Sequence, residues 1–403
     1  MRQIRTHLSE QPAGRGRTAR QLALFNASAG RAAAGILHQT TGLRIAMSSD
    51  FDGALRRSPL APGEGIFFER LGAALLNGDP DQARSLAERA GAHTLLVQGE
   101  RRLRASALPA PAERAPRADS THASWGLKAT RALCCGYSGR GIRVAILDTG
   151  LDLQHPDFAG RNVVSQSFVE GLPADDGNGH GTFCAGVACG PQRPCHGPRY
   201  GVAFGADLFV AKVLDDDAGG VDGNVLAAID WAVRNHCALV SMSLGTPALV
   251  GESHPQLYEQ VAARALAAGT VLVAPAGNHS QRPETITPVE HPANCPSILA
   301  VAAVDQSFAV APFSNGGLNR DGGEVDLAAP GISILSAAPR PTLYQTASGT
   351  SMATPYVTGI AALLAEAHPA ARGAALRALL LQALRPLPAP ARDVGGGLVQ
   401  APQ

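Results

Sequence analysis

Apolar and polar positions follow one rhythm through most of this chain. Beyond the first third, short runs of continuously apolar residues alternate with longer segments of helical spacing. Continuously apolar strands are typical of a parallel sheet covered on both faces, because helices connect successive parallel strands. We therefore expect an α/β fold with a doubly wound, mainly parallel sheet and helices on both faces. The predicted strands are 144–147, 208–214, 238–244, 271–274 and 298–304, and the predicted helices are 223–235, 256–268 and a segment that follows residue 351.

A shorter, mixed pattern precedes this region. Residues 43–104 combine strand-like runs with one helix at 79–90, which Asp79 and Pro80 would open as cap and first-turn residue, so we expect a small α+β domain here. Residues 105–118 are rich in proline and alanine and predict a linker, which leaves 119–403 as the larger domain. The strand-like runs are 43–47, 65–76 and 93–103.

Residues 1–42 predict a poorly ordered basic tail, because their arginines face a single acidic residue, Glu10. A transit peptide is the alternative, whereas the unbroken apolar centre of a secretory signal is missing. The 403 residues carry a formal net charge of +1 and no basic stripe, so we expect no nucleic-acid partner. No apolar run reaches the roughly 18 residues that a membrane span needs.

The seven cysteines give little sign of a metal site. Their number is odd, and their spacing does not form the paired CxxC motifs of zinc sites. Cys189 and Cys195 bracket a Pro/Gly loop and are placed to form a local disulfide. Without a secretory signal we expect reduced thiols, which favours a cytoplasmic location over secretion.

Three separated residues gain meaning when they are considered together. Asp148 directly follows the apolar run 144–147, His180 lies in a glycine-flanked turn, and Ser351 stands where a small-residue loop meets a helical segment. Singly, they are ordinary caps or solvated loop residues. Together they suit nucleophilic catalysis, because a serine hydroxyl needs a base and a histidine base needs a carboxylate to orient it. Asn278, just beyond a predicted strand, can offer its amide to the oxyanion that the attack creates.

The residues around these positions carry a family resemblance. The chain resembles the subtilisin-like serine peptidases, the subtilase family, from about Trp125 to Gln403, and the order Asp, His, Ser is that family's order. The block around Ser351 is the most specific. The matching blocks are VAILDTG at 144–150, HGTFCAG at 180–186, SMSLG at 241–245, AGN at 276–278 and GTSMATP at 349–355.

The resemblance implies a role for each residue. Ser351 would be the nucleophile and His180 the general base and acid, with Asp148 orienting the imidazole. The side chain of Asn278 and the backbone N–H of Ser351 would donate hydrogen bonds to the oxyanion. These roles describe an Asp-His-Ser catalytic triad that works through an acyl-enzyme.

The resemblance also implies a substrate cleft. Gly219 and Gly220 belong to an edge that would pair with an extended substrate backbone. Glu290 aligns with the base of the pocket for the residue before the scissile bond, where an acid would favour Arg or Lys by charge pairing. A solvent-exposed loop glutamate is the alternative for Glu290. The walls of this pocket would be Ser243, Leu244, Gly245, Pro275, Ala276 and Gly277.

Two departures from the family concern thiols and calcium. Cys184 lies one helical turn after His180, as in the thiol-bearing branch of the family, which implies sensitivity to mercurials; a small buried hydrophobic residue is the alternative. The family's common calcium loop is not matched by residues 189–199, and Asp175 and Asp176 are a weak substitute. We therefore expect that the chemistry requires no cofactor and that structural calcium lacks a matching loop.

These expectations point to a serine endopeptidase that is made as a self-processing zymogen. Residues 43–104 resemble the small propeptide that chaperones and inhibits such enzymes, so the linker 105–118 would contain the processing site. The expected partners are a protein or peptide substrate and the chain's own N-terminal domain. A peptide ligase or macrocyclase on the same scaffold, and a catalytically silent binding module, are the alternatives.

Overall fold

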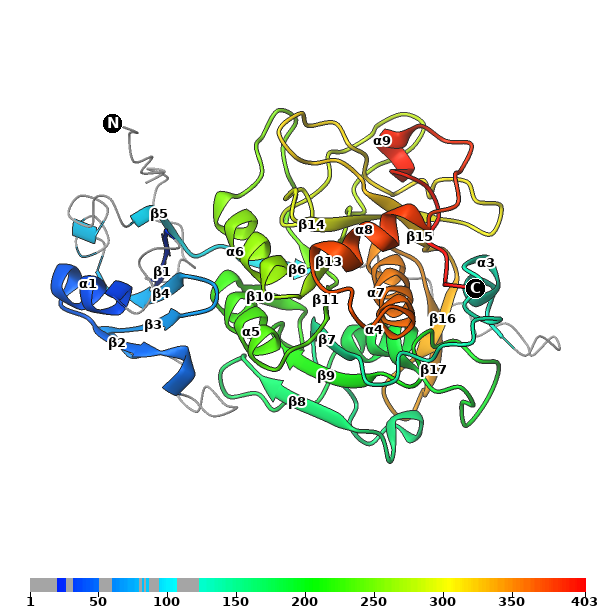
Figure 1. The fold of residues 1–403 in the computed structure, drawn as a ribbon, viewed down its shortest axis with the longest axis horizontal. Helices are drawn as coiled ribbons and strands as arrows, with labels where there is room; N and C mark the ends of the chain where they lie inside the picture. The colour runs from blue at the N-terminus through cyan, green and yellow to red at the C-terminus, as the bar shows by residue number, and fades with distance from the viewer. Residues whose placement is uncertain are drawn as a thin grey trace.

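A small N-terminal unit and a larger unit follow each other along the chain (Figure 1). Among the described residues, no helix is both long and apolar enough to cross a lipid bilayer. The computed structural model describes residues 20–26, 32–50, 60–79, 82, 85–86, 94–106 and 123–403.

A seven-stranded sheet forms the centre of the larger unit. All of its neighbouring strands pair in parallel, which confirms the predicted sheet. The apolar pattern did not reveal the two edge strands, because only one of the five residues of one strand is buried and the other strand has only four residues. The spatial order is β15 (Leu327–Pro330), β14 (Ile298–Val304), β13 (Val271–Pro275), β11 (Leu239–Met242), β7 (Arg143–Asp148), β9 (Asp207–Lys212) and β8 (Val163–Ser167).

Helices cover both faces of this sheet, and alternate residues of one strand serve the two faces. On β7, Ala145 and Leu147 join the core that contains α5 and α6, whereas Val144 and Ile146 join the core that contains α4 and α7. Both faces are therefore apolar, which explains the continuously apolar strands. The helices are α4 (His180–Cys189), α5 (Asp222–Arg234), α6 (Gln256–Ala267), α7 (Thr350–Ala367) and α8 (Ala374–Gln382).

Shorter elements complete the larger unit. A three-stranded antiparallel sheet has the order β10, β6, β12, and its central strand comes from the N-terminal part of the chain. The remaining elements are β6 (Arg102–Ala105), β10 (Gly219–Val221), β12 (Leu244–Gly245), the hairpin of β16 (Ile334–Ala337) and β17 (Tyr344–Ala347), α3 (Trp125–Ala129), η3 (Pro156–Phe158) and α9 (Ala391–Val394).

The N-terminal unit is a small α+β structure. Its five-stranded sheet has the order β2, β3, β4, β1, β5, and the helix α1 packs on one face. An α+β domain was expected here. The elements are β1 (Arg20–Phe25), α1 (Ala32–Thr41), β2 (Arg44–Met47), η1 (Ser48–Asp50), β3 (Glu64–Phe68), β4 (Ala73–Asn77) and β5 (Thr94–Gly99).

Three details of the predicted N-terminal part are wrong. The expected disordered tail, residues 1–42, contains β1 and α1, because Leu22 and Leu24 bury one face of β1 against the larger unit while Phe25 packs under α1. The single strand 93–103 is split between two sheets. The first two residues of the predicted linker, Ala105 and Ser106, continue an ordered strand.

Two other expectations fall largely outside the described residues. Only three residues of the predicted helix 79–90 are described as helical, with Asp79 Oδ1 accepting a hydrogen bond from Gln82 N at 2.8 Å. Residues 107–118 of the linker also lie outside them.

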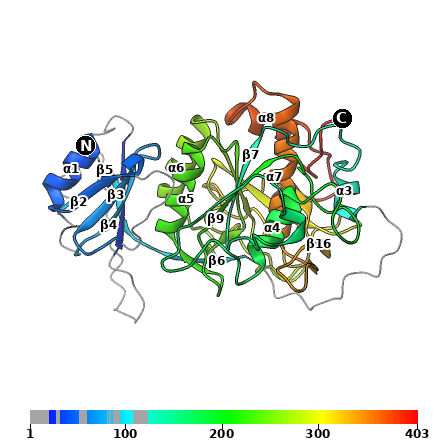
Figure 2. The ribbon, with the colours of Figure 1, turned by 90° about the horizontal axis from the view of Figure 1, so that it is seen from below.

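The N-terminal unit packs against α5 and α6, as both ribbon views show (Figures 1 and 2). Glu100 accepts a hydrogen bond from Gly223 N in the first turn of α5 at 3.0 Å, where a carboxylate is favoured by the helix dipole. Next to it, the buried Asp222 accepts from Arg101 Nε at 3.1 Å. The guanidinium of Arg264 on α6 donates to backbone carbonyls of the N-terminal unit. Charge and apolar burial together therefore hold the N-terminal unit against the larger unit.

Candidate active site

Asp148 and His180 meet at the carboxyl edge of the parallel sheet. Asp148 ends β7 and is fully buried. Its Oδ1 accepts hydrogen bonds from His180 Nδ1 at 2.8 Å and from Thr149 N at 2.7 Å. Because Nδ1 of the ring is committed to the carboxylate, the other nitrogen of His180 is left to act on a second group.

His180 is the first residue of α4, after Gly179 with a φ of 107°. Burial disfavours the imidazolium, but the charge and hydrogen bond of Asp148, together with the neighbouring Cys184, raise the pKa of His180 well above its ordinary value of 6.5. Among the described residues, His180 Nε2 is buried without a hydrogen-bond partner. The ring is therefore a base with one nitrogen anchored and one unengaged.

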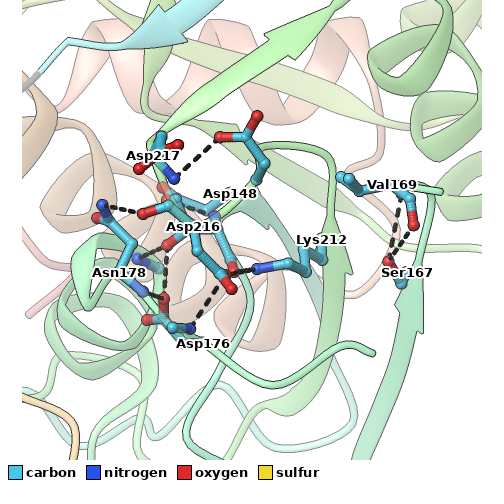
Figure 3. A network of polar contacts seen from close by, with 12 residues as sticks. Asp148, Ser167, Val169, Asp176, Asn178, Lys212, Asp216 and Asp217 are labelled. Atoms are coloured by element: carbon cyan, nitrogen blue, oxygen red, sulfur yellow. Dashed lines mark hydrogen bonds and ion pairs between the residues drawn. The ribbon is translucent and has the colours of Figure 1, made fainter. Parts of the chain in front are cut away.

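A network of polar side chains holds the two loops that carry this pair. Asp176 accepts from Thr149 Oγ1 at 2.8 Å and from Thr182 Oγ1 at 2.7 Å, which ties the Asp148 loop to the start of α4. Figure 3 shows Lys212 and Asp216 beside Asp148. The buried Lys212 bonds Thr149 O at 2.5 Å and Asp216 at 2.6 Å. We did not infer this network from sequence, although a lysine at the end of an apolar run was a signal.

Ser351 lies in the first turn of α7 and is fully buried. Its Oγ donates to Ser243 O at 3.5 Å, and its carbonyl accepts from Ser243 Oγ at 3.0 Å. Cys184 Sγ lies 3.6 Å from Ser351 O and 3.9 Å from His180 Nδ1. The structure thus brings Ser351 and His180 to one cluster, without a direct hydrogen bond between their side chains among those found in the described part.

Asn278 follows β13 and has its amide fixed from one side. Its Oδ1 accepts hydrogen bonds from Thr350 N and Thr350 Oγ1, both at 2.9 Å. Its Nδ2 donates to the backbone carbonyl of Ser106. Because Thr350 holds the amide oxygen, the amide nitrogen is aimed at a carbonyl placed beside the start of α7. Thr350 lies within the motif around Ser351, but sequence alone did not reveal this contact.

The chain's own residues 102–106 occupy the predicted substrate cleft. β6 pairs antiparallel with β10, in register Leu103 to Gly220, and with β12, in register Ala105 to Leu244. Ser106 continues the strand and donates its N–H to Ser243 O at 3.3 Å. The edge that contains Gly219 and Gly220 therefore pairs with an extended segment, as expected for a substrate, but sequence reasoning did not identify the occupant.

Glu290 lies beside Ser106, at the end of this extended segment. Only 1% of it is exposed, so the alternative of a solvent-exposed loop residue is wrong. Its backbone N–H donates to Ala276 O at 3.0 Å, and its carboxylate accepts from Ser106 Oγ. Burial raises the pKa of Glu290 to about 7. The segments that contain Ser243, Leu244, Gly245, Pro275, Ala276 and Gly277 lie around it.

One set of three potential metal ligands lies close together in the described part of the chain. Asp148, His180 and Cys184 have ligand atoms within 4.8 Å of one another. These are the same side chains that form the carboxylate–imidazole pair, so a soft metal here would compete with it. Asp175 and Asp176 are the two residues that the sequence offered in place of the family's calcium loop. Both carboxylate oxygens of Asp176 accept hydrogen bonds within the network described above, and Asp175 is exposed.

None of the seven cysteines is paired with another in the structure. All seven lie among the described residues and none forms a disulfide. Cys189 is buried and Cys195 exposed, so the local disulfide that their spacing permits is not formed.

The comparison with known proteins agrees with this geometry. The family model described as "Subtilase family" matches residues 139–397 of the 403. A solved structure described as a cold adapted subtilisin-like serine proteinase matches with a TM-score of 0.55 and 31% identity, over 66% of this chain and 92% of that chain.

Named relatives agree as well. Subtilisin E from Bacillus subtilis (strain 168) is 38% identical over 242 residues, which cover 60% of each chain, less than two thirds of that relative. A thermostable alkaline protease from Halalkalibacterium halodurans is 37% identical over 267 residues, 66% of this chain and 68% of that protein. The chain therefore belongs to the subtilase family, as its motifs predicted.

Proposed function

We propose that this protein is a serine endopeptidase that hydrolyses peptide bonds through Asp148, His180 and Ser351. One observation carries the proposal: an extended peptide segment pairs with β10 and β12 and presents the carbonyl of Ser106 to the fixed amide of Asn278. A peptidase needs this arrangement, because the carbonyl that is attacked must lie where the oxyanion donor already points. Relatives named as subtilisins and as a protease support the same activity.

Each side chain then has a step in the reaction. Ser351 Oγ attacks the substrate carbonyl while His180 Nε2 takes the hydroxyl proton, and Asp148 stabilises the imidazolium. Asn278 Nδ2 and Ser351 N–H hold the negative oxygen of the tetrahedral intermediate. His180 next gives its proton to the departing amine, which leaves an acyl-enzyme on Ser351. A water molecule, deprotonated by His180, hydrolyses that ester and frees Ser351.

The same geometry supports self-processing of a zymogen. The carbonyl that Asn278 Nδ2 contacts belongs to the peptide bond between Ser106 and Ala107. We place the processing site at this bond. After cleavage, the contacts of Glu100, Arg101 and Arg264 would keep the N-terminal unit bound, so it would act as an inhibitor until it is removed.

Self-processing predicts a defined pair of fragments. Purified wild-type chain should be cut between Ser106 and Ala107, whereas Ser351→Ala should keep its full mass, because its turnover should fall by about 10⁶-fold, a magnitude established in subtilisins. Intact-mass analysis checks this, with Ser348→Ala as the matched control that should still be processed. Cleavage at the same bond in Ser351→Ala would show that another protease makes the cut.

Covalent labelling tests the nucleophile itself. Processed wild-type protein should react with a fluorophosphonate at Ser351, and His180→Ala should label far more slowly, because the hydroxyl then lacks its base. Peptide mapping of the labelled protein locates the modified residue. Labelling at another serine would reject Ser351 as the nucleophile. No labelling in protein that has lost its N-terminal unit would favour a silent binding module over an enzyme.

The pKa of His180 predicts an alkaline activity profile. Protonated His180 cannot accept the serine proton, so a pKa raised above 6.5 should place the acid limb of kcat/KM above that pH. Asp148→Asn removes the charge that raises this pKa, and the limb should move to lower pH together with a large loss of rate. Glu290→Gln removes a carboxyl group with a pKa near neutral pH, so the acid limb that remains in this variant belongs to His180. If the acid limb stays at the same pH in Asp148→Asn, the limb does not report the protonation of His180, which would contradict the role of His180 as the base.

A further inference from the structure

The side chain of Ser106 ends against the carboxylate of Glu290. The backbone of Ser106 is fixed at both ends, since its N–H bonds Ser243 O at 3.3 Å and its carbonyl accepts from Asn278 Nδ2. An extended residue held in this way has only one direction for its side chain. The Oγ of Ser106 meets the carboxylate of Glu290 there.

The carboxylate lies between the two walls of the pocket. A Cβ placed on Gly245 would lie 2.7 Å from Glu290 Cδ, and one placed on Gly277 would lie 2.9 Å from Glu290 Oε2. A Cβ atom is hardly ever found this close to another heavy atom, so glycine at both positions leaves room for the carboxylate, and at Gly277 also for the amide of Asn315, whose Nδ2 would lie closer still. His279 Nδ1, on a half-exposed side chain, lies 3.7 Å from Oε2, and in the described part no lysine or arginine nitrogen is found within ion-pair distance of this carboxylate.

We propose that Glu290 makes this a shallow, polar pocket that selects a small hydroxylated residue, serine above all, immediately before the scissile bond. The inference rests on the proposed peptidase function of the cleft. The carboxylate meets an incoming side chain at its second heavy atom, Oγ, and so ends the pocket near its mouth. The substrate class is therefore a peptide with serine at this position, following an extended, strand-like stretch.

The length of the substrate side chain decides between a preference for serine and the charge pairing with Arg or Lys that was expected from sequence. Arginine and lysine complement the charge of Glu290, but their side chains carry several atoms beyond the point where the carboxylate lies. They would have to displace a side chain that is 1% exposed and packed between two backbone walls. Large apolar residues meet the same obstruction and also leave the carboxylate without a donor. Alanine fits but makes no hydrogen bond, which costs roughly a factor of 10 to 100 when the acceptor is charged.

The chain offers its own sequence as the test substrate. Peptides with Leu-Arg-Ala-X-Ala, which copy residues 103–107 with X in place of Ser106, are given to the processed protein, and kcat/KM is compared for X = Ser, Ala, Phe and Arg. Serine should be cut fastest, alanine roughly 10- to 100-fold more slowly, and Arg and Phe more slowly still. Glu290→Ala should abolish the advantage of serine and raise the rate for Phe, while Glu290→Gln should keep the pocket short.

Clear results would overturn this assignment. Arg cut faster than Ser would establish charge pairing in a deep pocket, and an unchanged order in Glu290→Ala would remove Glu290 from specificity. Loss of fluorophosphonate labelling in Glu290→Ala would show that this variant does not fold, and other variants then replace it as the test. The self-cleavage rates of the full-length variants Ser106→Arg and Ser106→Ala then give the same comparison. Self-cleavage of Ser106→Arg at the wild-type rate would reject the proposal. If Ser351-dependent labelling is present but every peptide is cut equally, the pocket assignment fails while the peptidase stands; if labelling is also absent, the proposed function fails.

Discussion

The fold depends on one constraint, that the carboxyl ends of parallel strands share one edge of the sheet. β7, β11 and β13 lie next to one another, so Asp148, Ser243 and the turn that contains Asn278 come to the same edge from distant parts of the sequence. Helices bury both faces of the sheet, so that edge rests on a packed core. The first turns of α4 and α7 then bring His180 and Ser351 to it.

The second organising feature is the pairing of β6 with β10 and β12. Backbone hydrogen bonds on both sides fix the position of Ser106, and the N-terminal unit anchors β6 through Glu100 and Arg101. One extended segment therefore links the two units, fills the cleft and presents a peptide bond to Asn278. Inhibition and processing use the same contacts, because a segment bound as a substrate blocks the cleft until it is cut and leaves.

Much of this was accessible from sequence, and the failures have physical causes. Motifs around Asp148, His180 and Ser351 identified the family, and apolar runs gave the five central strands of the parallel sheet. The strand β1 was not predicted, because its four buried residues follow an arginine-rich stretch. Its neighbours in the sheet also lie about 50 to 80 positions further along the chain. The contact between Glu290 and Ser106 could not be predicted, since the two residues lie 184 positions apart and only the folded chain brings them together.

The central claim is that the chain holds its own Ser106–Ala107 bond in its own cleft. The direct measurement is the rate of that cleavage as a function of protein concentration, made with Asn278→Ala, which should slow the reaction by about 10²–10³-fold, a range known from subtilisins, and so allow intact chain to be purified. The account predicts a first-order rate constant that does not change with concentration. A rate constant that rises in proportion to concentration would show that one molecule cuts another and would contradict it.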